Sequence, residues 1–184
     1  MEQLNAAIFF DFRHGYGTEQ LAVDLRDHVI GTCRGNNTIV NNLIKSCLNM
    51  RAPLSFFKQF IVEQNGDRKD RLDIKRRGLA PFVDFARVMS LKYGIRQTNT
   101  WVRLRRLRSK MQMPDNLYDE MVDAYELQMQ LRVINQLEQI ESGREPDDFI
   151  FPDQLTDLEK RMLKDGFSVI DYMQQVLKKE MEEH

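Results

Sequence analysis

Asp11 is the residue whose setting most clearly suggests chemistry. It stands in the run Ile8-Phe-Phe-Asp-Phe-Arg13, which is typical of a short buried strand that carries one carboxylate. Burying an unpaired carboxylate is costly, so an acid in such a place normally has a cationic partner or a metal ion. Two interpretations therefore stay open. Asp11 binds a divalent cation, or it is a strand-end acid that pairs with Arg13 or caps a turn.

A second candidate site is the basic cluster Lys75-Arg76-Arg77. We expect it at the end of a strand and just before a helix, whose N-terminus attracts anions because its first N–H groups are unpaired. In one interpretation the cluster holds the phosphates of a nucleotide or faces an acidic partner surface. In the other it is a solvated strand end that forms salt bridges with Asp73 or Asp84.

Composition and charge exclude some classes of protein. The chain has 184 residues, of which 42% are hydrophobic and 30% are charged, as in globular domains. Its net charge of -1 excludes a surface that is basic throughout, which is the mark of a general nucleic-acid binder. One helix carries a basic run, which we expect to be a solvated face rather than an RNA-binding stripe. This run comprises Arg103, Arg105, Arg106, Arg108 and Lys110.

Signals for targeting and for metal binding are missing from the sequence. Cys33 and Cys47 are too far apart for a zinc or redox motif, and the three histidines do not have the spacing of metal ligands. No apolar run approaches the ~20 residues of a membrane helix. The first apolar run has no basic region before it, unlike a secretory signal. We therefore expect a cytoplasmic protein with reduced thiols and no membrane segment.

Apolar residues at helical spacing predict that most of the chain is helical. Thr18 and Thr156 are expected N-caps, the second within the capping box Thr156-Asp-Leu-Glu159, and Gly94 is expected to end a helix. The faces expected to be buried contain Leu21, Ala22, Leu25 and Val29 in one helix, Ile39, Val40, Leu43, Ile44 and Cys47 in the next, Leu117, Met121, Ala124, Leu127, Leu131, Ile134 and Leu137 in a long helix, and Leu158, Met162, Phe167, Ile170, Met173 and Leu177 in the last.

In residues 57–76 the spacing of the apolar residues changes from the helical period to the two-residue period of a strand. Phe60 and Val62, and then Leu72 and Ile74, alternate with polar residues, and Asn65-Gly66 between them is a turn signal. These features predict a β-hairpin over residues 57–76. The expected fold is therefore mainly α: a helical bundle of four or more helices, with a small β-hairpin and a remnant N-terminal strand.

Several short motifs occur in an order that resembles one family, the nucleotidyltransferases of bacterial signalling proteins. These proteins often carry cyclic-nucleotide-binding and CBS domains upstream, and they are similar to PII-protein uridylyltransferases and glutamine-synthetase adenylyltransferases. The resemblance covers nearly the whole chain. Residues 36–184 resemble the family's helical substrate-binding domain, and residues 1–35 resemble the end of its catalytic domain. The motifs are Phe10-Asp11-Phe12-Arg13, Pro53-Leu54, Arg71-Leu-Asp-Ile-Lys-Arg-Arg-Gly78, Pro81, Asp84-Phe-Ala-Arg87, Gly94-Ile-Arg96 and Asn99-Thr100.

The resemblance implies a function and roles for individual residues. The longer protein would transfer UMP or AMP from a nucleoside triphosphate to a protein acceptor, such as a PII-like protein, with Mg²⁺ as the cofactor. Asp11 would be a metal ligand there, while Arg13 and the Lys75–Arg77 cluster would bind phosphate or the partner. On this basis we expect Asp11→Asn to impair catalysis in the longer protein and to have little effect on the stability of this chain.

The sequence also departs from the family pattern. It contains no Gly-Ser dipeptide and no Asp-x-Asp on a predicted strand, the two features that precede Asp11 in such enzymes. We therefore expect that the chain begins within a larger protein and is inactive by itself. The alternative is a helical regulatory module of a signal-transduction protein that binds a partner without catalysis.

Overall fold

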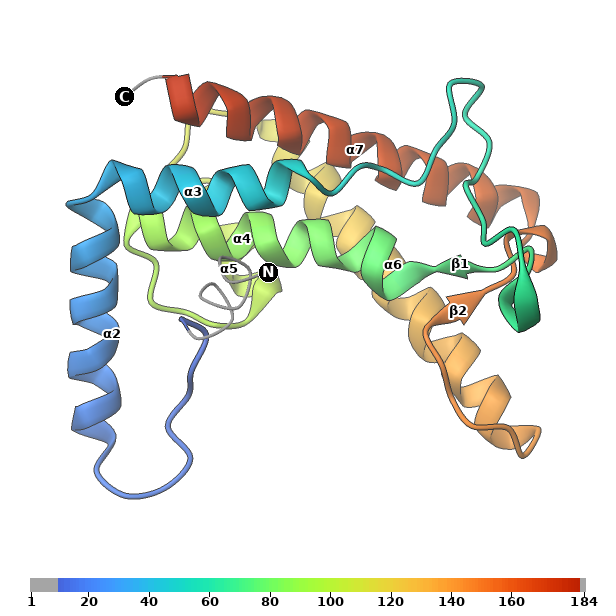
Figure 1. Ribbon diagram of the computed structural model, residues 1–184, viewed down its shortest axis with the longest axis horizontal. Coiled ribbons are helices and arrows are strands. Elements are labelled where there is room, and N and C mark those ends of the chain that lie inside the picture. The colour runs from blue at the N-terminus through green and yellow to red at the C-terminus, as the bar shows by residue number, and fades with distance from the viewer. Residues whose placement is uncertain (1–9, 183–184) are drawn as a thin grey trace. The chain divides into compact units, whose positions relative to one another are not determined.

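The computed structural model of the protein describes residues 10–182, which form two compact units. The first unit combines the described residues up to Met50, Val83–Tyr118, and the chain from Met173 onward. The second combines Arg51–Phe82 with Asp119–Tyr172. The described residues contain six α-helices and one two-stranded antiparallel sheet, so the prediction of a mainly α fold is confirmed (Figure 1).

The N-terminal strand is the first prediction that the structure corrects. Ile8 and Phe9 lie outside the described residues. Phe10 and Asp11 form a turn, and the chain from Phe12 to Gly15 is irregular, so no strand is present in the described part of this segment. The run of large apolar residues around Asp11 predicted a strand, but a strand needs a neighbouring strand to pair with its backbone.

Two helices of the first unit begin at an asparagine that caps them. Asn36 accepts a hydrogen bond from the N–H of Ile39, and Asn99 accepts one from the N–H of Val102, so each side chain caps the helix that follows it. The helices of this unit are α2 (Glu19–Arg34), α3 (Asn37–Leu48), most of α4 (Ala80–Tyr93), α5 (Thr100–Leu107) and the C-terminal end of α7 (Asp157–Glu182).

Helix α2 begins after Thr18 as expected, but its apolar face is not the predicted one. Leu21 is 71% exposed and Leu25 is 51% exposed, whereas Ile30 and Cys33 in its last turns are buried. The helix thus packs mainly through its C-terminal end, where it contacts α3. Helical spacing identified the helix correctly, but it does not say which part of the helix another element covers.

Helix α3 confirms the sequence-based prediction more closely. Val40, Leu43, Ile44 and Cys47 are buried along one face. Burial raises the pKa of the Cys47 thiol to about 12, and the nearby carboxylate of Asp84 in α4 adds to the effect. Cys33 and Cys47 are both free, and a buried thiol with a raised pKa is unreactive.

The second unit contains most of α6 (Asp115–Glu141), the N-terminal part of α7 and a small sheet. The strand β1 (Leu72–Asp73) pairs antiparallel with β2 (Phe149–Ile150), and a π-helix, Ile74–Leu79, follows β1 directly. The predicted hairpin over residues 57–76 is therefore wrong in its pairing. Its first arm forms only an isolated bridge between Leu54 and Phe60.

A close approach in the second unit depends on Gly78. The π-helix brings Gly78 so near α6 that a Cβ atom placed on it would lie 2.1 Å from Oε1 of Gln128. The same Cβ would lie 3.3 Å from the ring of Phe167 in α7. Only glycine leaves this space free, because it has no Cβ. Gly78 ends the motif that carries the strongest resemblance to the nucleotidyltransferases, so its role there is in packing.

The two long helices confirm part of their predicted faces. Leu117, Met121, Ala124 and Leu131 of α6 are buried as expected, and Leu127 is half-buried. The four later predicted positions of α7, Phe167, Ile170, Met173 and Leu177, are also buried. The other predictions fail at the C-terminal end of α6 and the N-terminal end of α7, where these side chains are exposed: Ile134, Leu137, Leu158 and Met162. The capping box is present, since Thr156 N–H and Glu159 N–H each donate to the other residue's side chain.

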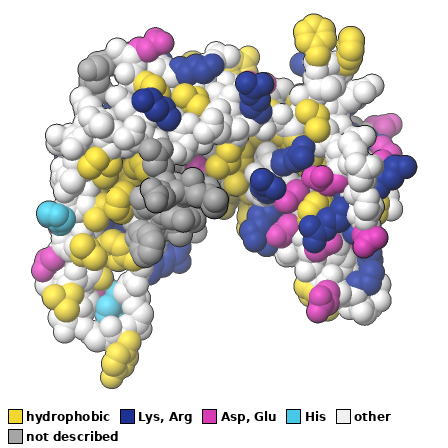
Figure 2. All heavy atoms as spheres, in the orientation of Figure 1, with side chains coloured by type: hydrophobic (Ala, Val, Ile, Leu, Met, Phe, Trp, Pro, Cys, Tyr) yellow, Lys and Arg dark blue, Asp and Glu magenta, His cyan; other side chains and the backbone are white. Residues whose placement is uncertain are grey.

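A loop of the second unit presents two aromatic side chains to solvent. Phe56 is 95% exposed and Phe57 is 81% exposed, and hydrophobic side chains project from the loop after α3 in Figure 2. The loop is nevertheless ordered by its backbone. Ser55 N–H donates to the carbonyl of Gln59 at 2.8 Å, and Lys58 N–H donates to the carbonyl of Ser55 at 2.9 Å.

Candidate functional site

The carboxylate of Asp11 is held by two arginines of the first unit. Nε of Arg87 in α4 donates to Oδ2 at 2.6 Å, and Nη2 of Arg103 in α5 donates to Oδ1 at 2.5 Å. Burial opposes the ionisation of Asp11, but the hydrogen bonds from Arg103 and Arg87 outweigh it and lower the pKa of the carboxyl. Asp11 is therefore an anion at neutral pH, and its partners are Arg87 and Arg103 rather than the neighbouring Arg13.

Arg87 joins Asp11 to a second carboxylate. Its Nη1 donates to Oδ1 of Asp84 at 2.5 Å, one turn earlier in α4. Burial raises the pKa of Asp84, against the effect of Arg87, and the negative charge of Asp11 raises it further. Arg87 thus binds both Asp11 and Asp84, and the negative charge of each acid opposes the ionisation of the other. The three side chains form a coupled ionic cluster rather than a simple ion pair.

Arg103 carries a charge that is almost completely buried. Its side chain is 2% exposed, and its Nε donates to the carbonyl of Gln97 at 2.6 Å. Its Nη1 is buried and has no hydrogen-bond partner among residues 10–182. A buried donor without a partner is rare in proteins and is often explained by a ligand or an unseen water. Asp11 neutralises the charge of Arg103 through Nη2, whereas Nη1 has no hydrogen bond to any described residue.

Arg26 of α2 brings another positive charge close to this cluster. Its guanidinium donates to the carbonyls of Phe10 and Phe12 and lies 4.6 Å from the centre of the Phe12 ring. Burial lowers the pKa of Arg26, and the positive charges of Arg103 and Arg13 lower it further. Three arginines from distant parts of the sequence therefore repel one another at this place.

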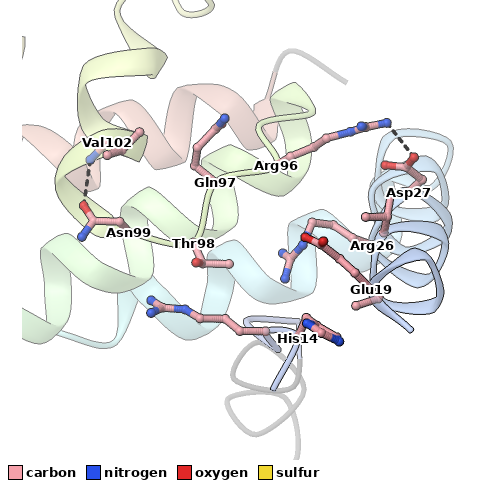
Figure 3. Close-up of a pocket in the computed structure, with 12 residues that line it drawn as sticks. His14, Glu19, Arg26, Asp27, Arg96, Gln97, Thr98, Asn99 and Val102 are labelled. Atoms are coloured by element: carbon pink, nitrogen blue, oxygen red, sulfur yellow. Dashed lines mark hydrogen bonds and ion pairs between the residues drawn. The ribbon is translucent and has the colours of Figure 1, made fainter. Parts of the chain in front are cut away.

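A cavity of about 470 Å³ lies beside the cluster in the first unit. Figure 3 shows it between α2 and the segment that leads into α5, with Thr98, Glu19 and Arg26 around it. Arg96 also lines it, and its guanidinium donates to Oδ2 of Asp27 at 2.6 Å. The lining consists of Arg13, His14, Glu19, Ala22, Val23, Arg26, Asp27, Arg96, Gln97, Thr98, Asn99 and Val102.

The described residues do not by themselves fit a magnesium site. Both oxygens of Asp11 accept hydrogen bonds from guanidinium groups, and two cations beside a carboxylate oppose the binding of a dication. Mg²⁺ requires several oxygen ligands in octahedral geometry. Among residues 10–182, no group of three or more His, Cys, Asp or Glu side chains is placed to hold a metal ion. The metal role of Asp11 in a longer protein stays a prediction.

The basic cluster Lys75-Arg76-Arg77 belongs to the second unit, whereas Asp11 and Arg13 belong to the first. Lys75 forms an ion pair with Asp148 at 3.2 Å, and Arg77 forms one with Glu63 at 3.2 Å. The side chain of Arg76 is exposed. Two of the three cations thus have acidic partners, although these partners are not the ones that the sequence suggested.

Asp148 is the centre of the ion pairs around the small sheet. Arg132 of α6 donates to its Oδ1 at 2.5 Å, and Lys75 lies near its Oδ2. Burial opposes the ionisation of Asp148, but Arg132 and Lys75 outweigh it and lower the pKa of the carboxyl. Figure 2 shows basic and acidic side chains interspersed over β1 and β2, as these pairs require. Asp148 therefore offsets much of the positive charge at this end of the cluster.

Sequence reasoning did not assign Arg87 and Arg103 to the candidate site. Arg103 was placed on a solvated face with the other basic residues of its helix, and that expectation is wrong for this residue alone. The sequence contains one signal for this. Arg103 lies next to Leu104 and one turn before Leu107, which puts it on the apolar side of the helix, and in the structure all three residues are buried. A charged residue on the apolar side of a helix indicates a buried partner.

Comparisons with known proteins point to a family but not to an individual protein. A search of curated proteins and a search of solved structures each found no significant match. Among the described residues, no helix combines the length and the apolar character that crossing a bilayer requires. The family model described as "Putative nucleotidyltransferase substrate binding domain" matches residues 37–181. Because this match covers most of the sequence, the chain belongs to the family of nucleotidyltransferase substrate-binding domains.

Proposed function

We propose that this chain is the C-terminal, substrate-binding portion of a signalling nucleotidyltransferase, which transfers UMP or AMP from a nucleoside triphosphate to a protein acceptor. The observation that carries the proposal is the family match over residues 37–181. The acceptor would be a PII-like or similar protein, and the reaction would take place in the bacterial cytoplasm. Mg²⁺ would be held by carboxylates of the longer protein, because the described residues do not fit it.

The ion pairs of Asp11 suggest what this chain contributes to the enzyme. In our proposal the segment up to residue 35 belongs to the catalytic domain, and the helices from residue 36 onward belong to the substrate-binding domain. Arg87 and Arg103 come from that second part, and they bind the carboxylate of Asp11 from the first. Asp11 would thus hold the end of the catalytic domain against α4 and α5, and would fix its position relative to the substrate-binding domain.

Label transfer tests this proposal directly. The longer protein that carries the domain is incubated with Mg²⁺, a PII-type acceptor, and UTP or ATP labelled at the α-phosphate. We expect label on the acceptor with one of the nucleotides, and none with heat-inactivated protein. The 184-residue chain alone should transfer none, because two-metal chemistry needs carboxylates that its described residues do not bring together. If the longer protein transfers label from neither UTP nor ATP, the proposal is overturned.

The second candidate function is a non-catalytic interaction module of a signal-transduction protein. The exposed pair Phe56 and Phe57 favours it, since large aromatic side chains in full contact with water are a common feature of binding surfaces. The two functions differ in one outcome. An interaction module would bind its acceptor with or without nucleotide, and this binding would weaken in a Phe56→Ala, Phe57→Ala variant while no label is transferred.

A further inference from the structure

The cavity in the first unit has the charge of an anion site. Three of its lining residues are arginines, namely Arg13, Arg26 and Arg96, and two are acids, Glu19 and Asp27. Asp27 is engaged by Arg96. Within the described part of the chain, Arg26 donates to the backbone carbonyls of Phe10 and Phe12, which carry no net charge, so these contacts do not cancel its positive charge. The lining therefore has a positive excess, before any contribution from the buried cluster behind it.

The buried cluster behind the cavity is close to neutral, because the two cations Arg87 and Arg103 face the two acids Asp11 and Asp84. Arg103 stands directly behind the cavity wall, because its Nε donates to the backbone carbonyl of Gln97, a lining residue. Asp11 and Asp84 are the two acids that pair with Arg87 and Arg103, and both are already shared within that cluster. Arg26 and Arg13 are left as the cations nearest to the cavity. Arg26 is half-buried, and a charge at such a place acts more strongly than one at an open surface.

The size and the polar groups of the cavity suit a phosphate-bearing ligand. Its volume of about 470 Å³ lies within the usual range of small-molecule sites. Guanidinium groups bind phosphate through paired N–H donors, so they prefer it to a single-point anion. The Thr98 hydroxyl and the Gln97 and Asn99 amides line the same space (Figure 3). The amide oxygen of Asn99 is taken by Val102 N–H, which leaves its NH₂ group as the donor.

We propose that this cavity binds the phosphate groups of a nucleoside triphosphate, with Arg13 and Arg26 as the main cationic contacts. The proposal rests on the proposed function, and it names the place where the substrate's phosphates bind within this chain. It also selects between two basic sites. In the Lys75–Arg77 cluster, Asp148 and Glu63 already occupy two of the three cations.

Titration calorimetry on the 184-residue chain tests the proposal without requiring catalysis. The probes are ATP, UTP, inorganic phosphate and adenosine. We expect one binding site for the triphosphates, competition by inorganic phosphate, and no binding of adenosine. Arg13→Gln should weaken triphosphate binding about tenfold, because a hydrogen bond to a charged group is worth ~1.5 kcal/mol or more. Arg13 is exposed, so this change leaves the core intact.

Two further variants serve as controls. Arg161→Gln removes an exposed arginine of the second unit and should bind like the wild type. Thr98→Val removes one lining hydroxyl while keeping the side-chain volume, and it should also weaken triphosphate binding. It therefore tests the cavity independently, even if Arg13→Gln perturbs folding. Unchanged affinity in both Arg13→Gln and Thr98→Val would overturn the proposal. The proposal would also be overturned if triphosphate binding were lost in the triple variant Lys75→Ala, Arg76→Ala, Arg77→Ala and kept in the two cavity variants.

Failure of this inference is distinguishable from failure of the proposed function. If the longer protein transfers label but the chain binds triphosphate independently of Arg13 and Thr98, the enzyme assignment stands and the cavity assignment falls. If binding depends on Arg13 but no label is transferred, the cavity assignment stands and the catalytic proposal falls.

Discussion

Nη2 of Arg103 donates to Oδ1 of Asp11 at 2.5 Å, across 92 positions of the sequence. The guanidinium is buried in α5, and the carboxylate comes from the irregular segment before α2. Neither residue could remain charged at this place without a partner, because an isolated buried ion is strongly destabilised. The pair therefore attaches the N-terminal part of the described chain to the helices of the first unit.

Replacing Asp11 should destabilise this chain, contrary to the expectation from sequence alone. Asp11→Asn removes the charge that neutralises Arg87 and Arg103, and leaving a buried charge without its partner costs about 3 kcal/mol. Denaturant unfolding should show a lower midpoint with an unchanged slope. Asp171→Asn changes an exposed acid of α7 and is the matched control. Equal midpoints for Asp11→Asn and the wild type would mean that the pair contributes nothing to stability.

The ion pairs of Asp148 predict a dependence of stability on pH. Arg132 and Lys75 hold the folded-state pKa of Asp148 below its ordinary value of 3.8. A depressed pKa stabilises the fold above the unfolded-state pKa, and this contribution is lost as the pH falls through the folded-state pKa. The free energy of unfolding should therefore decrease below about pH 4. Asp148→Asn should be less stable at pH 7 and should show a smaller decrease between pH 7 and pH 3. An identical decrease in both proteins would contradict the assignment.

Gly78 should not tolerate a side chain. In Gly78→Ala the new methyl group would overlap Oε1 of Gln128, so this fully buried side chain must move, and the Phe167 ring would lie only 3.3 Å from the methyl group. Overpacking of this kind costs about 1–3 kcal/mol. Gly31→Ala is the matched control, because a Cβ at Gly31 in α2 would meet nothing within 4 Å. That change should be neutral or stabilising, since alanine favours a helix over glycine. Thermal melting of the two variants checks both expectations, and equal melting temperatures would show that the site relaxes.

The Lys75–Arg77 cluster should bind anions more weakly than the cavity and with a stronger dependence on salt. Lys75 and Arg76 are exposed, and charges at such positions are screened over ~8 Å at physiological ionic strength. The variant with all three residues changed to Ala should therefore keep most of its triphosphate affinity at 150 mM salt and differ from the wild type mainly at low salt. Calorimetric titration at two salt concentrations measures this. A large loss at both concentrations would identify the cluster as the main anion site.

The sequence by itself determined the elements whose signals are local. Thr156 and Glu159 lie three residues apart, and their reciprocal hydrogen bonds start α7 whatever else surrounds them. Gly94 ends α4 with a φ of 73°, which glycine adopts without strain. The sequence also predicted the buried face of α3, which contains Val40, Leu43, Ile44 and Cys47, because apolar residues recur there at helical spacing. The family resemblance rested on the order of short motifs along the sequence, and it is confirmed by the match over residues 37–181.

Only the tertiary structure decided which distant residues became partners. Leu72 looked like one arm of a local hairpin, yet it pairs with Ile150, because Ile74 N–H also donates to the carbonyl of Asp148 and draws the two segments together. Asp11 looked like a metal ligand or a partner of Arg13, yet Arg87 and Arg103 bind it. The physical reason is the same in both cases. A carboxylate or a strand edge is satisfied by any suitable group that packing brings within hydrogen-bond distance, and the spacing of residues along the chain does not contain that information.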